Sequence, residues 1–250
     1  MISKKAQIGL NCKIGEGAII NDDVIIGNGV TIGAYCLIDD GARIDDNVQI
    51  HHGASISAQP QDLKFKGEIT QLYIGKGTIV REYATLNRGT AASGKTVIGE
   101  NCLFMAYSHA AHDTVIGNNV IAANCVSIAG HVEIGNWVII GGLSGIKQFT
   151  KIGDHALITS CVMITKDIPP YIIAGGKDVK YEGLNVIGLR RRGFTSERIN
   201  KIKSVYDVIY RSGLNFSDSL KKIKSEIEPD EDVNNIINFI EHSKYGIIKG

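Results

Sequence analysis

Residues 8–56 read IGLNCKIGEGAIINDDVIIGNGVTIGAYCLIDDGARIDDNVQIHHGASI, with an isoleucine at every sixth position. The same phase resumes at Ile74 and continues to Ile164, and 19 of the 27 positions in the series are isoleucine. A small residue, most often Val, Ala or Cys, stands four positions after most members of the series. A period of six fits neither a helix nor a simple strand alternation. It predicts a short strand and a tight corner, repeated many times.

Three such units make one triangular coil, with the large and the small apolar residues pointing inward. Stacked coils then pair as parallel strands ~4.8 Å apart. We therefore predict a hexapeptide-repeat parallel β-helix over residues 1–170. The pattern fails near 57–73 and 87–97, where polar residues replace the apolar ones. We expect both stretches to be loops ejected from the prism, where functional residues tend to lie.

Residues 171–250 predict a connector and a small helical C-terminal domain. Apolar residues return there at helical spacing behind three candidate N-caps, Thr195, Ser217 and Asp230. The first of these helices is expected to end near Gly213, because glycine is common just past a helix C-terminus.

Composition excludes several classes of protein. The 250 residues carry 27 Lys and Arg against 26 Asp and Glu, so the surface as a whole is not built for nucleic acid. No apolar run approaches the ~18 residues that cross a bilayer, and no signal peptide is evident. The five cysteines have no paired metal-ligand spacing. We expect reduced thiols in a cytoplasmic protein.

The stacking rule also predicts which polar side chains meet, since residues three repeats apart lie one coil above another. It gives two neighbouring columns outside the prism, His112–Gly130–Gln148 and Asp113–His131–Phe149, with His109 nearby. Ordinary surface or subunit-contact histidines are one interpretation. The other is a site for acyl transfer.

The second interpretation has a clear chemistry. A neutral imidazole can take a proton from a sugar hydroxyl, and a carboxylate such as Asp113 can orient it. The Gly130 N–H can donate to a developing oxyanion. A zinc site of His109, His112 and His131, as in γ-class carbonic anhydrases, is a weaker alternative because the spacings of 3 and 19 differ from that family's pattern. We therefore predict no metal.

Five segments carry a resemblance to a known family. They are PQDLK at 60–64, NRGT at 87–90, HAAHD at 109–113, AGH at 129–131 and GLRRRGF at 188–194. In this order, and including the helical tail, the chain resembles the UDP-N-acetylglucosamine 3-O-acyltransferases, which begin lipid A biosynthesis. The NRGT form and the ending GIIKG at 246–250 look most like the Bacteroidota branch.

The resemblance implies a left-handed β-helix and a homotrimer with active sites between adjacent prisms. It implies transfer of a (3R)-3-hydroxyacyl chain from acyl carrier protein to the 3-hydroxyl of UDP-N-acetylglucosamine. No cofactor is implied beyond the phosphopantetheine of the carrier protein, which delivers the acyl chain.

The resemblance also assigns roles to residues. His112 would be the general base, Asp113 its partner and Gly130 the oxyanion donor. The other implied substrate-binding residues fall into three groups: His109, His131 and Gln148 for the sugar nucleotide; Asp62, with Gln61 and Lys64, for the 3-hydroxyl of the acyl chain; and Asn185, Arg191 and Arg192 for phosphates or the pantetheine arm.

The basic C-terminal region offers a docking surface for the acidic carrier protein. Residues 177–250 hold 14 Lys and Arg against 11 Asp and Glu. We predict carrier-protein contacts at Arg190, Arg198 and Lys201. A solvated helix face is the alternative interpretation.

Some positions depart from the family pattern. Asn87 and Lys147 stand where many relatives have histidine, and Ile187 replaces a common glutamate. These differences leave open whether the acceptor carries a hydroxyl or an amine, so an N-acyltransferase for a 3-amino sugar nucleotide remains an alternative. Ser160, a small residue at the position that ends the acyl groove in relatives, favours a long chain. A non-catalytic structural β-helix is a further alternative, but the flat face of repeated Thr or Ser that it needs is missing.

Overall fold

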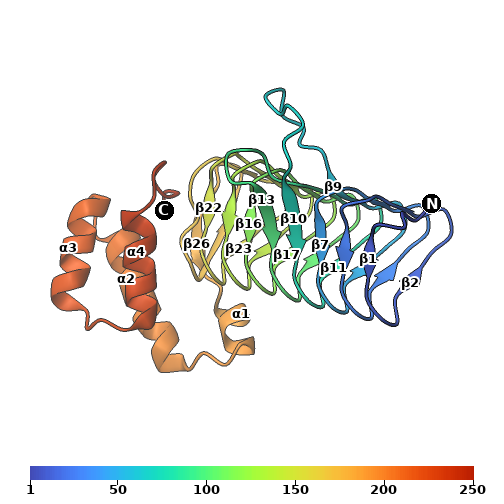
Figure 1. The fold of residues 1–250 in the computed structure, drawn as a ribbon. Coiled ribbons are helices and arrows are strands. Elements are labelled where there is room, and N and C mark those ends of the chain that lie inside the picture. The colour runs from blue at the N-terminus through green and yellow to red at the C-terminus, as the bar shows by residue number, and fades with distance from the viewer.

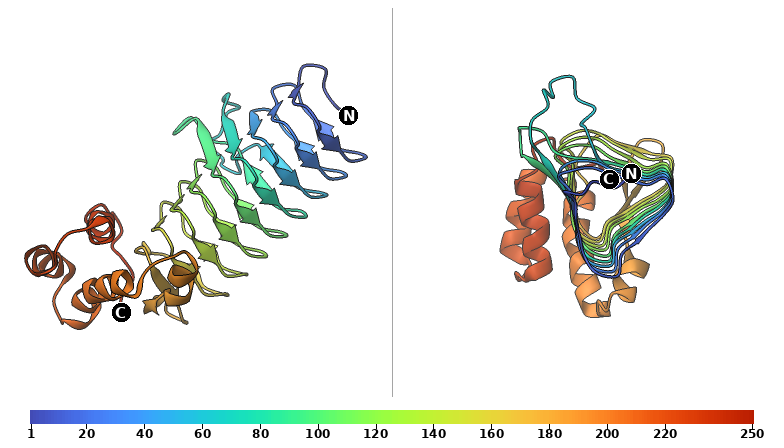
Figure 2. Two further views of the ribbon diagram at one scale, coloured as in Figure 1. Left: turned by 90° about the horizontal axis from the view of Figure 1, so that it is seen from below. Right: turned by 45° about the vertical axis from the view of Figure 1, so that its right-hand side comes forward.

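The computed structural model describes residues 1–250, and its first two thirds form a regular prism of stacked coils (Figure 1). Seen along its axis, each coil is a triangle with one short strand per side (Figure 2). The strands of each side pair in parallel, one coil above another. The predicted parallel β-helix with a helical tail is confirmed.

The three sides are three sheets. The first sheet contains β1 (Gln7–Ile8), β4 (Ile25–Ile26), β7 (Ala42–Ile44), β10 (Gln71–Ile74), β13 (Lys95–Ile98), β16 (Val115–Ile116), β19 (Glu133–Ile134) and β22 (Lys151–Ile152). The second contains β2 (Lys13–Ile14), β5 (Thr31–Ile32), β8 (Gln49–Ile50), β11 (Ile79–Val80), β14 (Leu103–Phe104), β17 (Ile121–Ala122), β20 (Ile139–Ile140), β23 (Leu157–Ile158), β25 (Ile172–Gly175) and β26 (Lys180–Leu184). The third contains β3 (Ile19–Ile20), β6 (Leu37–Ile38), β9 (Ser55–Ala58), β12 (Thr85–Asn87), β15 (His109–Ala110), β18 (Ser127–Ile128), β21 (Gly145–Ile146) and β24 (Met163–Ile164).

The isoleucine series forms the core of the prism. Ile38, Ile56 and Ile128 are completely buried, and so are small inward residues such as Val30 and Val126. Most strands contribute two residues, of which the isoleucine points inward and its neighbour outward. Hydrophobic burial along this column therefore fixes the register, because a shift by one residue would turn every isoleucine to solvent.

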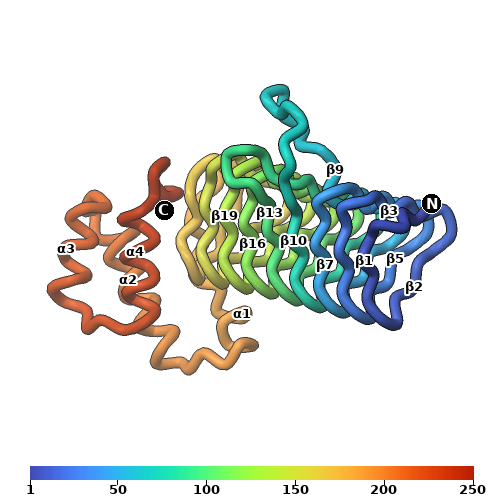
Figure 3. The backbone as a smooth tube through the Cα atoms, viewed as in Figure 1, coloured from blue at the N-terminus to red at the C-terminus, as the bar shows by residue number.

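Two loops leave the prism, at 59–70 and 88–94, within the stretches predicted from the broken pattern. In a regular coil His109 pairs with Ser127, whereas around the loops Ser55 pairs with Thr85 and Thr85 with His109. Relative to the regular coil, the first of these coils is longer by two hexapeptide repeats and the second by one. Because the loops add whole repeats, the isoleucine phase resumes unchanged after each of them. The longer loop projects from the prism (Figure 3).

The C-terminal helices are α1 (Val186–Arg191), α2 (Ser196–Arg211), α3 (Phe216–Glu226) and α4 (Glu231–Glu241). Thr195 and Asp230 cap α2 and α4 as predicted. The prediction for Ser217 was wrong, because Asn215 caps α3 by accepting from the Asp218 N–H. Asparagine is among the best N-cap residues, so the helix begins earlier than expected. The short helix α1, only six residues long, was not predicted from the sequence.

The sheets continue beyond residue 170, where the sequence placed the end of the β-helix. β25 pairs with β23, and β26 folds back antiparallel onto β25. The Tyr206 hydroxyl of α2 donates to the Pro170 carbonyl at 2.6 Å, which ties the helices to the end of the prism. None of the helices combines the length and the apolar character required to cross a membrane.

Candidate active site

One corner of the prism, between the third and first sheets, gathers the three predicted catalytic residues. We call the stacked turns along this corner the histidine corner. They contain His112 and Asp113 after β15, and Gly130 and His131 after β18. Asp113 and His131 both have a positive φ, near 60°, which turns the chain sharply at the corner. His112 Nδ1 lies 2.8 Å from Asp113 Oδ2. The pair predicted from the sequence is thus in hydrogen-bond contact.

Although these side chains lie outside the prism, they are hidden from solvent. Only 7% of His112 and 5% of Asp113 is exposed. Thr90 and Ser93, from loop 88–94, lie against the Asp113 carboxylate. The sequence predicted outward-facing columns but not this cover, because nothing in the repeat says where an ejected loop folds back.

The Asp113 carboxylate accepts hydrogen bonds on both oxygens. Thr90 donates its hydroxyl to Oδ2 at 2.6 Å and its N–H to Oδ1 at 3.0 Å, and the Ser93 hydroxyl also donates to Oδ1. Burial alone would raise the pKa of Asp113, but the bonds from Ser93, Thr90 and His112 outweigh it and lower the pKa to about 2. The carboxylate is therefore ionised at neutral pH.

This charge sets the tautomer of His112. An ionised carboxylate can only accept, so Nδ1 carries the proton and Nε2 keeps a lone pair. Nε2 faces Gly130: a Cβ on Gly130 would lie 2.8 Å from Nε2 and 2.6 Å from Cε1. The Gly130 N–H donates to no acceptor within the chain. A base and a free backbone donor thus stand side by side.

Two further histidines flank the pair. His131 Nε2 lies 3.6 Å from Asp113 Oδ2, and its ring stacks on Phe149 with centroids 4.7 Å apart. His109 Nδ1 is 2.7 Å from the Thr85 hydroxyl, and burial lowers the pKa of His109, which keeps it neutral. Both rings can therefore offer hydrogen-bonding groups to a polar ligand.

His112, Asp113 and His131 also offer possible metal-ligand atoms, all within 4.8 Å of one another. Zinc ligands bind at about 2.0–2.2 Å, and the donors around this carboxylate already occupy both of its oxygens. The arrangement is better suited to holding and moving a proton than to coordinating an ion.

Other predicted residues lie elsewhere on the chain. Gln61, Asp62 and Lys64 are on the projecting loop, where Asp62 Oδ1 accepts from the Lys64 N–H at 2.9 Å. Asn87, one of the departures from the family pattern, is buried and donates to the Ala58 and Gln59 carbonyls at the base of that loop. Its position indicates a structural role.

Asn185 and Arg192 lie near a different corner, between the first and second sheets, which we call the tail corner. Asn185 caps α1 through Oδ1 and donates to the His155 carbonyl at 2.9 Å, so both polar atoms of its side chain have partners. The Arg192 guanidinium stands 5.3 Å from the Trp137 ring, and its Nη1 is buried without a partner. Arg191, in α1, is exposed.

The tail corner holds a histidine that sequence reasoning missed. The His155 ring stacks on Tyr171, and its edge meets Phe194. Burial, with the nearby Arg192 charge, lowers the pKa of His155 to about 4. The spacing of three repeats between Trp137 and His155 predicts that the two residues lie at the same corner, one coil apart. It does not predict the contacts of His155 with Tyr171 and Phe194.

Two of the three predicted carrier-protein contacts, Arg198 and Lys201, are paired with acidic residues of the helical tail. Arg198 forms a bidentate ion pair with the buried Asp232 and stacks on Phe194 at 3.9 Å. Lys201 lies 2.9 Å from Asp230. Both side chains thus hold the helices together, whereas Arg190 is exposed on α1.

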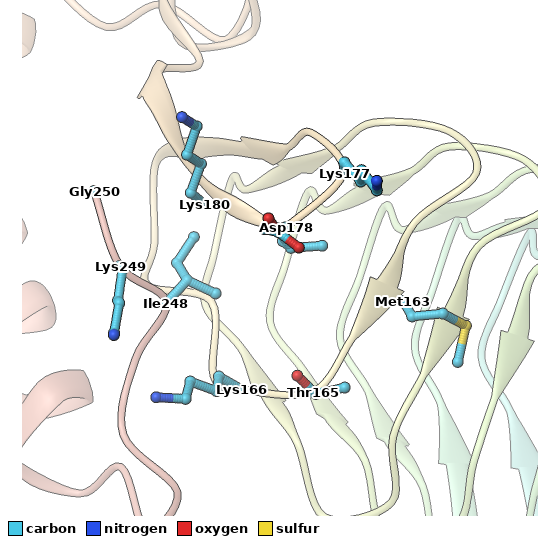
Figure 4. Close-up of a pocket in the computed structure, with 10 residues that line it drawn as sticks. Met163, Thr165, Lys166, Lys177, Asp178, Lys180, Ile248, Lys249 and Gly250 are labelled. Atoms are coloured by element: carbon cyan, nitrogen blue, oxygen red, sulfur yellow. The ribbon is translucent and has the colours of Figure 1, made fainter.

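Lysine side chains without an ion-pair partner gather instead at the C-terminal end of the histidine corner. A hollow of about 500 Å³ lies there, with Met163, Val179 and Ile248 as its apolar lining (Figure 4). Four lysines also line this hollow: Lys166, Lys177, Lys180 and Lys249. None of them has a carboxylate oxygen within 4.0 Å of its ammonium group. We call this group the lysine rim. Asp178 is the one acidic side chain in the lining.

Comparison with known proteins agrees with this geometry. A family model described as UDP N-acetylglucosamine O-acyltransferase, domain 2, matches residues 167–248, and a bacterial transferase hexapeptide model matches 5–40 and 95–130. The acyl-[acyl-carrier-protein]–UDP-N-acetylglucosamine O-acyltransferase of Thermodesulfovibrio yellowstonii is 40% identical over all of this chain and 97% of its own. That of Chlorobaculum parvum is 57% identical over 76% of this chain and 73% of its own.

Solved structures give the same result. LpxA from Bacteroides fragilis superimposes with a TM-score of 0.96 at 43% identity, over 99% of this chain and 97% of that one. LpxA from Acinetobacter baumannii gives 0.96 at 38% identity, over 100% and 97%. Fold and site together define a hexapeptide-repeat acyltransferase built on a left-handed parallel β-helix. Within that class, the chain belongs to the UDP-N-acetylglucosamine O-acyltransferase family.

Proposed function

We propose that this acyltransferase moves a (3R)-3-hydroxyacyl chain from acyl carrier protein to the 3-hydroxyl of UDP-N-acetylglucosamine, the first step of lipid A biosynthesis. The observation that carries the proposal is the contact of His112 with the ionised Asp113, beside Gly130, whose N–H has no acceptor within the chain. The reaction belongs in the cytoplasm, and the five unpaired cysteines suit a reducing compartment.

The mechanism follows from the free nitrogen of His112. Nε2 takes the proton of the sugar 3-hydroxyl as that oxygen attacks the thioester carbonyl. The negative charge that develops on the carbonyl oxygen is stabilised by the Gly130 N–H. The tetrahedral intermediate then collapses, the C–S bond breaks, and the imidazolium returns its proton to the thiolate. Asp113 stabilises the imidazolium throughout.

Substrate recognition is divided among neighbouring elements. His109, His131 and Gln148 surround the base along the histidine corner and would hold the sugar. Asp62, on the projecting loop, would accept a hydrogen bond from the 3-hydroxyl of the acyl chain, with Gln61 and Lys64 beside it. This loop exposes Leu63 and Ile69 almost completely, which suits contact with another surface.

We infer a homotrimer whose sites lie between chains. His112 is at the histidine corner, whereas Arg192, proposed to bind phosphate, is near the tail corner of the same prism. If one substrate contacts both, the second residue must come from an adjacent prism. Cyclic trimers supply such repeated heterologous contacts.

Mixing two inactive chains tests the shared site. Co-expressed His112→Ala and Arg192→Ala chains should recover activity, because about a quarter of the sites in random trimers would combine an intact His112 with an intact Arg192. Each variant alone should remain nearly inactive. Activity of the mixture equal to the average of the two separate variants would show that each site lies within one chain.

We propose that the acidic carrier protein docks at the lysine rim, with Arg190, on α1 at the tail corner, as a further contact from an adjacent prism. Lys166 continues the column of His112, Gly130 and Gln148, three coils beyond His112. Three coils span about 14 Å at ~4.8 Å each. A phosphate bound at the rim would therefore let an extended pantetheine arm run along the corner to the base.

Charge reversal at the rim tests this docking. The double variant Lys166→Glu/Lys177→Glu should raise KM for acyl carrier protein about tenfold and flatten its salt dependence. KM for UDP-N-acetylglucosamine should stay within twofold, because that ligand binds nearer the histidines. The matched control is Lys203→Glu, an exposed lysine on α2. Equal increases for both substrates would contradict the assignment.

The proposed reaction itself is tested by mass spectrometry. The protein is incubated with UDP-N-acetylglucosamine, or its 3-amino analogue, and a series of 3-hydroxyacyl carrier proteins. We expect an ester at the 3-hydroxyl of the sugar, and the mass of the product gives the preferred chain length. Acylation of the amine alone would overturn the choice of acceptor.

A further inference from the structure

Loop 88–94 makes three of the four hydrogen bonds that hold the Asp113 carboxylate. The Thr90 hydroxyl shares Oδ2 with His112 Nδ1, while the Thr90 N–H and the Ser93 hydroxyl meet at Oδ1. None of the Asp113 side chain is exposed, so water does not compete for these positions. The orientation of the carboxylate is therefore decided by this loop.

The loop can perform that task because it is fixed at both ends. Arg88 Nη1 donates to the Ser57 carbonyl at 2.9 Å and to the Asp40 carbonyl at 3.2 Å. The Gly94 N–H donates to the Thr90 carbonyl at 2.8 Å and closes the turn. Gly89 packs so tightly on Lys95 that a Cβ on Gly89 would lie 2.3 Å from the backbone nitrogen of Lys95. Thr90 and Ser93 thus stand on a rigid support.

A second imidazole makes this orientation matter. His131 Nε2 lies only 3.6 Å from the same Oδ2 that contacts His112 Nδ1 at 2.8 Å. A small rotation of the carboxylate would let it pair with His131 instead, and His112 would lose the partner that sets its tautomer. With both oxygens held by hydroxyl and amide donors, that rotation is opposed.

We propose that Thr90 and Ser93 are positioning residues that keep the Asp113 carboxylate on His112 and away from His131. The inference rests on the proposed role of His112 as the base. It goes beyond that role, because it assigns part of the rate to a loop that does not touch the reacting atoms. The family resemblance assigns no role to these two residues.

The test compares Thr90→Val/Ser93→Ala with the wild type. Valine keeps the shape and the N–H of Thr90 but removes its hydroxyl. We expect kcat to fall about 10- to 100-fold, since a misplaced catalytic group can cost that much. KM for both substrates should stay within about twofold. Thr90→Ser, which retains the hydroxyl, should keep most of the activity, and Ala91→Ser, exposed in the same loop, is the matched control.

The pH profile of kcat separates positioning from a general loss of structure. With the hydroxyl donors gone, burial is less opposed and the pKa of Asp113 rises from about 2. Because His112 acts as a base only when it is unprotonated, the acid limb of the profile follows the imidazole and not Asp113. A carboxylate that has turned from His112 stabilises the imidazolium less, so this limb should move to lower pH in the double variant than in the wild type. A merely structural role would lower kcat evenly across pH.

Two outcomes would overturn the inference. A double variant with kcat within threefold of wild type and an unshifted acid limb shows that the loop does not position the carboxylate. His112→Ala is measured in the same series to separate the two hypotheses. If that variant is inactive while the double variant is normal, only the positioning role fails. If His112→Ala is itself active, the proposed base fails and the inference falls with it.

Discussion

Replacing His112 by alanine is expected to lower kcat by about 10²- to 10⁴-fold, the usual contribution of a positioned general base. The ring lies outside the prism core, so the isoleucine column and the strand pairing remain intact. Thermal melting and the mass of the assembly should therefore be nearly unchanged. The measurement is steady-state turnover with saturating substrates, with sedimentation and a melting curve on the same preparation.

A matched histidine variant makes this result specific. His52 also lies near a corner of the prism, where its Nε2 is 2.9 Å from the Tyr83 hydroxyl. This corner joins the second and third sheets, so it is not the corner that holds Asp113. His52→Ala should keep normal turnover. Activity of His112→Ala within threefold of wild type would refute the assignment of the base.

Gly130→Ala should lower kcat by about 10²- to 10³-fold, comparable with the loss of an oxyanion donor. The added Cβ would lie 2.6 Å from His112 Cε1, closer than atoms can approach, so the imidazole must move. The φ of Gly130 is not in the left-handed region, so alanine fits the backbone and the fold should survive. The substitution thus displaces the proposed base and crowds the proposed oxyanion donor.

Gly142→Ala is the control for this prediction. The nearest atom to its Cβ would be the Asn124 carbonyl oxygen at 3.1 Å, at a different corner of the same prism. Turnover should stay near wild type, with melting temperatures of both glycine variants within a few degrees of it. A Gly130→Ala enzyme with normal kcat would show that the space beside His112 is not needed for catalysis.

The helical tail shows where local sequence signals are reliable. Thr195 and Asp230 cap their helices as predicted, because an N-cap bonds to an N–H in the adjacent first turn. Ser217 was the wrong cap, since a better one, Asn215, precedes it. The partner of Arg198 could not be predicted, because Asp232 is distant in the chain and meets it only when α2 packs beside α4.

The sequence alone determined the prism and the two columns of side chains that run along one of its corners. A period of six predicts one short strand and one corner per repeat, and with three repeats per coil of constant length His112 lies beside Gly130 and Asp113 beside His131. The tertiary structure decided what surrounds them. Loop 88–94 has no repeat to fix its path, so only its hydrogen bonds to the folded prism bring Thr90 and Ser93 onto Asp113. Periodic burial can be read residue by residue, whereas the path of a non-repeating loop depends on contacts that exist only after the coils have stacked.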